Sequence, residues 1–211
     1  MPASATDTTP PLEELAGAPT RERLLLAAEH LAATQRWSAL TMSDVASLAG
    51  VSRQTVYNEF GNKTALGEQV ALRVAVRVVD AVQAEMAQHD EIQEAIAAAV
   101  TLALDLAEEE PLVRAVLTGA RGGADESLLP FLTTRAGPIL SMAATALTAQ
   151  FVERWPELDE EEVELVAESA VRLIVSHIVQ ATDSHERTGR RVAWMLARVV
   201  GVGDESAPLP S

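Results

Sequence analysis

The stretch from residue 41 to 63 constrains the fold most, because it predicts two short helices joined by a tight turn. Thr41 can cap the first helix, and Asp44 follows three residues later, as in a capping box with a shortened acid. Gly50 can adopt the left-handed conformation that ends a helix. Ser52 can then cap a second helix of about two turns.

The residues around this turn have the sizes that a close crossing of two helices requires. Ala46 is small where the helices would cross, and Val51 and Val56 would fill the angle between them. Two short helices joined in this way form a helix-turn-helix, whose second helix can enter the major groove of DNA. Such a pair can also serve for packing alone, so the side chains on its second helix decide the interpretation.

The second helix of the pair carries polar side chains on the face predicted to point away from the core. Val56 and Phe60 are four residues apart and are expected to face inward. The residues on the remaining faces are Arg53, Gln54, Thr55, Tyr57 and Asn58. Side chains of these types contact phosphates and base edges, so the sequence predicts a DNA-binding surface.

Composition favours helices in the rest of the chain. Of the 211 residues, 48% are apolar but only 3% are aromatic, so the core must be built mainly from Ala, Val and Leu. Alanine and leucine are strong helix formers, and runs with strand-like alternation are hard to find. The sequence therefore predicts an all-α fold.

Apolar residues at helical spacing divide the chain into segments. The predicted organisation is a disordered tail over residues 1–19, a helix-turn-helix domain over 20–66, a larger helical domain over 67–201 and a flexible tail over 202–211. Thr20 is the expected N-cap of the first helix, and Pro138 predicts a kink or a break in a helix over 128–154. Further helices are expected at about 63–88, 91–106, 111–117, 159–182 and 186–200.

Several protein classes are excluded by what the sequence lacks. Cysteine is absent, which excludes disulfides and thiolate metal ligands. No apolar run approaches the roughly 20 residues that span a bilayer, and residues 1–19 have neither the basic start nor the apolar centre of a secretory signal. We expect a soluble, cytoplasmic protein without a membrane partner.

The net charge of −15 is unevenly distributed along the chain. Residues 20–70 carry five basic and five acidic side chains, whereas residues 71–211 carry 11 basic and 23 acidic ones. An acidic C-terminal domain repels DNA and leaves the neutral N-terminal domain as the docking surface. The same acidity can also serve solubility alone.

Residues 20–66 resemble the TetR family of one-component transcriptional regulators. The resemblance is carried by the first helix RERLLLAAEHLAA, by Trp37, and by LTMSDVASLAGVSRQTVYNEFGNKTAL, in which the AGVS turn, Thr55, Tyr57 and Phe60 occur together with a lysine after a short break. It implies a three-helix DNA-binding domain followed by a larger bundle for ligand binding and dimerisation, with about nine helices. It also implies a homodimer, a palindromic operator on double-stranded DNA and, most commonly, repression.

The resemblance assigns roles to individual residues. The predicted DNA-binding residues are Thr41, Ser52, Arg53, Gln54, Thr55, Tyr57, Asn58 and Lys63. In the family, positions matching Thr41, Tyr57 and Lys63 contact phosphates, whereas positions matching the other polar residues of the recognition helix read or approach bases. Glu59 departs from the family pattern, because a carboxylate near DNA costs affinity unless it accepts from cytosine or faces away.

The last two predicted helices and the bundle before them suggest two further functions. An apolar face on the penultimate helix (Val163, Val166, Ala167, Ala170, Val171, Ile174 and Ile178) and another on the last helix (Val192, Trp194, Leu196 and Val199) favour a four-helix dimer interface. A mainly apolar effector, lipid-like or hydrocarbon-like, is expected in the bundle. Its candidate contacts are Leu104, Arg114, Leu117, Phe131, Arg135, Leu140, Met142, Phe151, Trp155 and His177.

Nothing in the sequence supports an enzyme. The four histidines do not cluster, no serine, histidine and aspartate set can be assembled, and the acidic runs sit at a helix end and a helix start. We predict neither a metal site nor a cofactor. Two alternatives stay open: a helical small-molecule carrier or sensor without operator binding, and a protein-interaction adaptor. A mobility shift with the DNA upstream of the protein's own gene would separate them from the regulator.

Overall fold

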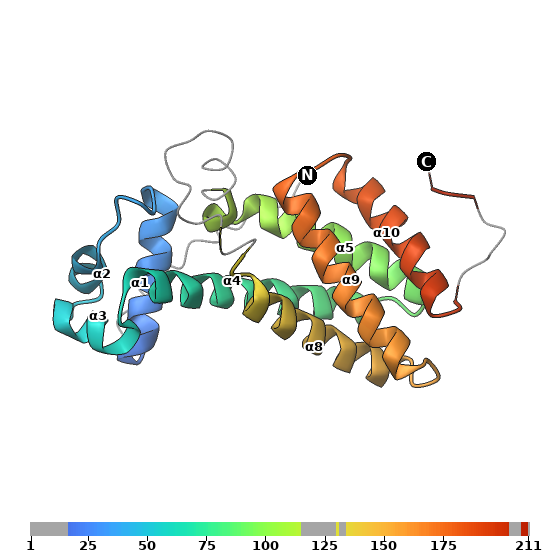
Figure 1. Cartoon of the computed structure of the whole chain (residues 1–211), viewed down its shortest axis with the longest axis horizontal. Helices are drawn as coiled ribbons and strands as arrows, with labels where there is room; N and C mark the ends of the chain where they lie inside the picture. Colours follow the sequence, from blue (N-terminus) through green and yellow to red (C-terminus); the bar gives the residue numbers. More distant parts are fainter. Residues whose placement is uncertain (1–16, 115–129, 131–133, 203–207, 211) are drawn as a thin grey trace. The chain divides into compact units, whose positions relative to one another are not determined.

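The computed structural model describes residues 17–114, 130, 134–202 and 208–210. Eight α-helices are described from end to end, residues 111–114 are helical as well, and the described residues contain no strand (Figure 1). The chain divides into two compact units, one of Met1–Arg73 with Glu109–Thr133 and the other of Val74–Glu108 with Thr134–Ser211. The all-α prediction is confirmed, and each unit is described by itself below.

The first unit is a small helical domain built on three short helices. They are α1 (Thr20–Thr34), α2 (Met42–Leu48) and α3 (Arg53–Phe60), followed by the start of α4 (Lys63–Met86). Helix α2 packs on both α1 and α3. The side chains that fill the space between them are apolar and buried: Leu24, Trp37, Leu40, Val45, Val56 and Leu66.

The turn between α2 and α3 has the geometry that its sequence predicts. Thr41 and Asp44 form a complete capping box, and the Ser52 hydroxyl accepts a hydrogen bond from the Thr55 amide. Gly50 has a φ of +67°, in the region that side chains with a Cβ rarely adopt. The predicted cap at Thr20 is wrong, because α1 already begins there and Pro19 occupies the capping position without a side-chain bond.

The second unit is a bundle of longer helices. It contains the remainder of α4, α5 (Ile92–Glu109), α8 (Gly137–Arg154), α9 (Glu160–Val179) and α10 (His185–Val199). Helices α8 and α9 lie side by side with the most extensive packing, and α10 packs on α9. The core between the helices is mainly Val, Ala and Leu, with Phe151 as its one buried aromatic side chain among the described residues.

Two helix boundaries depend on proline. Helix α8 begins at Gly137 with Pro138 in its first turn, so the predicted disruption at Pro138 is a helix start rather than a kink. Helix α5 continues to Glu109, three residues beyond the predicted end, and stops just before Pro111. The ring of a proline disfavours helical backbone at the residue before it, and α5 accordingly ends before Glu110.

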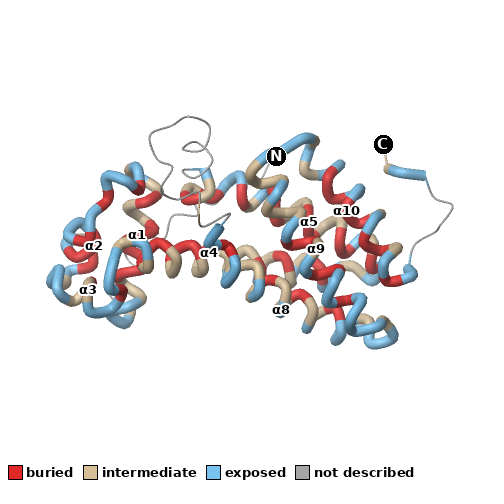
Figure 2. Tube along the Cα trace, in the orientation of Figure 1, coloured by how far each residue is buried: buried red, intermediate tan, exposed pale blue. Residues whose placement is uncertain are grey.

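The apolar faces predicted to form a dimer interface are mostly used inside the subunit. On α9, Val163, Val166, Ala167, Ala170 and Val171 are buried in the core of the second unit, and on α10 so are Val192 and Leu196 (Figure 2). Ile174, Ile178 and Trp194 are partly buried, and Val199 is exposed. Packing within the chain therefore covers most of these faces, and the predicted dimer interface is left with the side chains that stay partly or fully exposed.

None of the described helices combines the length and the apolar character that crossing a bilayer requires.

Candidate DNA-binding surface

Helix α3 presents two rows of paired polar side chains on its exposed surface. Arg53 Nη2 donates to the Tyr57 hydroxyl at 3.1 Å, and Gln54 Nε2 donates to Asn58 Oδ1 at 2.9 Å. Both pairs are separated by four residues and therefore lie along the helix axis. Their opposite neighbours on α3, Val56 and Phe60, are buried, as predicted. The exposed face of α3 is thus polar, while its opposite face is apolar and packs into the core of the first unit.

A shallow depression beside α3 brings together four of the predicted phosphate or base contacts. It has a volume of about 410 Å³ and is lined by Leu40, Thr41, Met42, Ser43, Arg53, Tyr57, Asn62 and Lys63. These residues come from the start of α2, from α3 and from the start of α4. Ser43 and Asn62 were not predicted. Ser43 lies two residues after the N-cap Thr41, in the first turn of α2, where backbone amides are not bonded within the helix, and that signal could have found it.

Lys63, the first residue of α4, lines the depression and bonds the segment before α2. Its ammonium donates to the carbonyl oxygens of Trp37 and, at 3.1 Å, Ser38, and lies 5.6 Å from the centre of the Trp37 ring. The carbonyls lie within the segment that connects α1 to α2, so Lys63 joins that segment to α4. Its predicted phosphate contact would therefore come from an ammonium already engaged by the protein.

The start of α2 holds a carboxyl group whose pKa is lowered, that of Asp44. The hydrogen bonds from the Thr41 hydroxyl, at 2.7 Å, and the Thr41 amide, at 2.8 Å, lower the pKa of Asp44, and the charge of Lys63 adds to the effect. Asp44 is therefore ionised at neutral pH. The hydroxyl proton of Thr41 is directed to Asp44, so the hydroxyl can offer an outside group only its remaining acceptor site.

The structure shows where Glu59 points. Its carboxylate lies 3.6 Å from the guanidinium of Arg21 on α1, and its backbone carbonyl accepts from the same guanidinium at 3.3 Å. The sequence left open whether Glu59 faces the DNA, because the partner is 38 residues away and no local pattern connects them. The ion pair accounts for a carboxylate on this helix.

The residues predicted to contact an effector are spread through the bundle. Leu104 and Phe151 are buried in the core of the second unit, and Leu140, Met142 and Trp155 pack against it. Trp155 also joins the end of α8 to the segment between α4 and α5, because its ring nitrogen donates to the Asp90 carbonyl at 3.2 Å. His177 is partly buried and bonds the Leu173 carbonyl through Nδ1 at 2.8 Å. Arg114 and Arg135 are exposed, and Leu117 and Phe131 lie outside the described residues.

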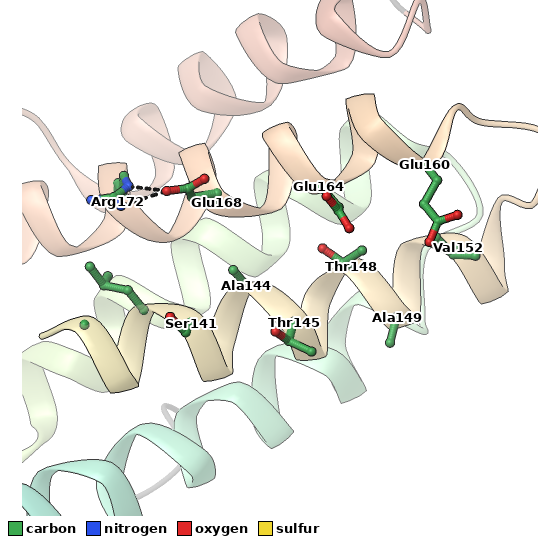
Figure 3. Close-up of a pocket in the computed structure, with 12 residues that line it drawn as sticks. Ser141, Ala144, Thr145, Thr148, Ala149, Val152, Glu160, Glu164, Glu168 and Arg172 are labelled. Atoms are coloured by element: carbon green, nitrogen blue, oxygen red, sulfur yellow. Dashed lines mark hydrogen bonds and ion pairs between the residues drawn. The ribbon is translucent and has the colours of Figure 1, made fainter.

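A groove of about 600 Å³ between α8 and α9 has a mixed lining, in which charged side chains stand opposite small and apolar ones (Figure 3). Small side chains of α8, among them Ser141, Ala144 and Thr148, form one wall. The other wall carries a ladder of carboxylates that ends at an ion pair of 2.7 Å: Glu160, Glu164 and Glu168, with Arg172. Of the predicted effector contacts that the structure describes, only Leu140 lines it. Its carboxylates do not suit an uncharged, apolar ligand.

Comparison with known proteins places this geometry in one family. Residues 24–70 match the family model described as bacterial regulatory proteins of the tetR family, and residues 91–198 match that of the tetracyclin repressor C-terminal domain. The HTH-type transcriptional regulator AlkX of Mycobacterium tuberculosis is 36% identical over 191 residues, which cover 90% of this chain and 87% of the relative.

Solved structures agree with the family models. The TetR family repressor AlkX from a Dietzia strain, implicated in biodegradation of n-alkanes, superposes with a TM-score of 0.74 at 28% identity, over 87% of this chain and 96% of that one. The TetR family repressor QsdR of R. erythropolis has the same fold, with a TM-score of 0.63 at 20% identity, over 90% and 98% of the two chains. The chain therefore belongs to the TetR family of bacterial transcriptional regulators.

Proposed function

We propose that this regulator is a repressor that binds a palindromic operator as a homodimer and is released by a small, mainly apolar effector. The observation that carries the proposal is the exposed polar edge of α3, in which Arg53 and Tyr57 border the depression and Gln54 and Asn58 lie along the helix beside them. A regulator of this kind binds chromosomal DNA, so its proposed location is the cytoplasm. In this proposal, residues 20–66 bind DNA, and residues 67–201 bind the effector and form the contact with the second subunit.

The two sets of side chains suit different parts of a duplex. The depression gathers the hydroxyl of Tyr57 and the cations of Arg53 and Lys63 at the start of α2, a combination that suits a phosphate. The amides of Gln54 and Asn58 can pair with the edge of adenine in the major groove. Ser52 and Thr55, whose hydroxyls lie 2.9 Å apart, open the helix and suit a phosphate or a nearby base.

The homodimer is proposed on the exposed apolar side chains of the bundle. Leu165 on α9 is 55% exposed, and Met195 and Val199 on α10 are 43% and 38% exposed. A second copy would cover them, and two recognition helices would then reach half-sites about one helical turn apart. Sedimentation of the purified protein as a monomer at micromolar concentration would contradict the dimer.

The effector is proposed to be a hydrocarbon or a lipid-like molecule. The relative from Dietzia is described as implicated in biodegradation of n-alkanes. The core of the second unit consists mainly of aliphatic side chains. An apolar ligand can favour one conformation of the bundle only by the difference between its affinities for the two conformations. Adding a medium-chain n-alkane or its fatty acid to the protein–DNA complex should therefore release the DNA.

The test of DNA binding begins with duplexes that the purified protein selects from a random pool at low ionic strength. Asn58→Ala should change the preferred sequence, whereas Lys63→Ala should weaken all duplexes alike and lower the salt slope by about one. Because Lys63 also holds the segment before α2, the melting temperature of this variant is measured alongside. Selection of no duplex, without effector present, would refute the proposal in favour of a carrier or sensor.

A further inference from the structure

The C-terminal end of α3 carries a charge that is unfavourable there by itself. Glu59 is the penultimate residue of the helix, where the helix macrodipole and the last carbonyl groups already provide negative charge. The same end must stay in place if the side chains of α3 are to meet successive bases. The contacts around Glu59 therefore help to determine the position of α3.

Arg21 of α1 contacts this end through Nη1 and the face of its guanidinium, and it reaches α4 through Nη2. Nη1 donates to the Glu59 carbonyl at 3.3 Å and lies 3.6 Å from the Glu59 carboxylate. Nη2 donates to Gln69 Oε1 on α4 at 3.0 Å. The centre of the guanidinium lies 4.7 Å from the centre of the Phe60 ring, which is 7% exposed. One side chain thus joins α1, α3 and α4.

We infer that Arg21 is a positioning residue for sequence recognition. It caps an end carbonyl of α3, neutralises Glu59 and fixes the helix against α1 and α4, which sets the position of Gln54 and Asn58. The planar fork is essential, because its two arms reach different acceptors on different helices, and a lysine ammonium cannot reproduce that geometry. The inference rests on the proposed function of α3 as the recognition helix.

The competing explanation is that Arg21 contacts a phosphate directly, since its side chain is 48% exposed. The two roles differ in what they do to sequence preference and to salt dependence. A phosphate contact contributes equally to every duplex, and its loss lowers the salt slope by about one. A positioning residue acts on base contacts, so its loss reduces the discrimination between operator and unrelated DNA and leaves the salt slope unchanged.

The experiment measures dissociation constants for the selected operator and for a scrambled duplex of equal length, each over a range of salt concentrations. The variants are Arg21→Ala, Arg21→Lys, Gln69→Ala and the double variant Arg21→Ala with Gln69→Ala. Arg36→Ala is the matched control, because it removes one exposed cation of the same domain that lies in the segment between α1 and α2. Melting curves by circular dichroism show which variants are folded.

We expect Arg21→Ala to weaken operator binding by about fivefold to tenfold, in the range of one ordinary lost hydrogen bond. Binding to the scrambled duplex should change by less than about twofold, with the same salt slope. Arg21→Lys should behave like Arg21→Ala, although it keeps the charge. Gln69→Ala should give a smaller loss of the same kind, and it should add little in the Arg21→Ala background because both act through one contact.

The opposite pattern would overturn the inference. If Arg21→Ala weakened both duplexes equally with a lower salt slope, and Arg21→Lys bound as the wild type does, Arg21 would be a phosphate contact. Unchanged discrimination in folded Arg21→Lys and Gln69→Ala would overturn it even if Arg21→Ala did not fold. Failure of the wild-type protein to select any operator would instead refute the proposed function, on which the inference depends.

Discussion

Gly189 offers the sharpest test of how the bundle is packed. It lies buried on α10, where an added Cβ would lie 2.6 Å from the backbone carbonyl oxygen of Ala97 on α5 and would also collide with the Thr101 hydroxyl. Thr101 donates to the Ala97 carbonyl at 2.8 Å, so its hydroxyl cannot turn away without losing that bond. The backbone carbonyl can move only if α5 moves with it.

The size of the effect follows from opposing contributions. In an unobstructed helix, replacing glycine by alanine stabilises by about 1 kcal/mol. Overpacking a tight contact costs about 1–3 kcal/mol, and loss of the Thr101 hydrogen bond costs about 1 kcal/mol. Because one obstructing atom belongs to the backbone, we expect Gly189→Ala to lower the free energy of unfolding by about 2–3 kcal/mol, or the melting temperature by about 5–10 °C.

The measurement is denaturant unfolding followed by circular dichroism, at one fixed protein concentration because an assembly's stability depends on it. Gly137→Ala is the control, since a Cβ at this helix start meets nothing within 4 Å and should leave stability unchanged or slightly raised. Adding Thr101→Ala to Gly189→Ala should restore only part of the loss, because the Ala97 carbonyl stays in place. A Gly189→Ala protein as stable as the wild type would refute the close contact between α5 and α10.

Three further predictions concern the first unit. Gly50→Ala should cost about 1–2 kcal/mol through its positive φ alone, since space is open there, and Gly50→Asn should cost less in the same denaturation assay. Arg73→Met should cost about 3 kcal/mol, because the Arg73 guanidinium lies 3.3 Å from the carboxylate of Glu29, which is 4% exposed; a double variant with Glu29→Leu should recover much of the loss. The lowered pKa of Asp44 gives stability that is fully present above its ordinary value of 3.8 and is lost as the pH falls through the lowered value. Unfolding midpoints in Asp44→Asn should therefore fall less on acidification, and a slope equal to that of the wild type would contradict the capping interaction.

Much of the first unit could be predicted because its signals are local. A capping box spans four residues, a glycine with positive φ ends the helix that precedes it, and a buried residue recurs every three or four positions. These patterns predicted the turn after α2, the inward face of α3 and the polar surface opposite it. The predicted roles of the DNA-contacting side chains remain predictions.

Other features of the site depended on residues far apart in the sequence. Neither the partner of Glu59 nor the engagement of Lys63 by the carbonyls of Trp37 and Ser38 could be found from spacing, because the pairs are separated by 25 to 38 residues. The predicted effector contacts could not be separated from ordinary core residues, since periodicity shows that a residue is covered but not by what.

The amino-acid sequence by itself determined the helical class, the helix-turn-helix and the polar face of its second helix, since each follows from contacts within one or two turns of the chain. Only the tertiary structure decided that the apolar faces of α9 and α10 serve mainly the subunit's own core, and that Arg21 holds the end of α3. An apolar stripe requires burial but does not specify its partner. That choice depends on how helices distant in sequence pack together.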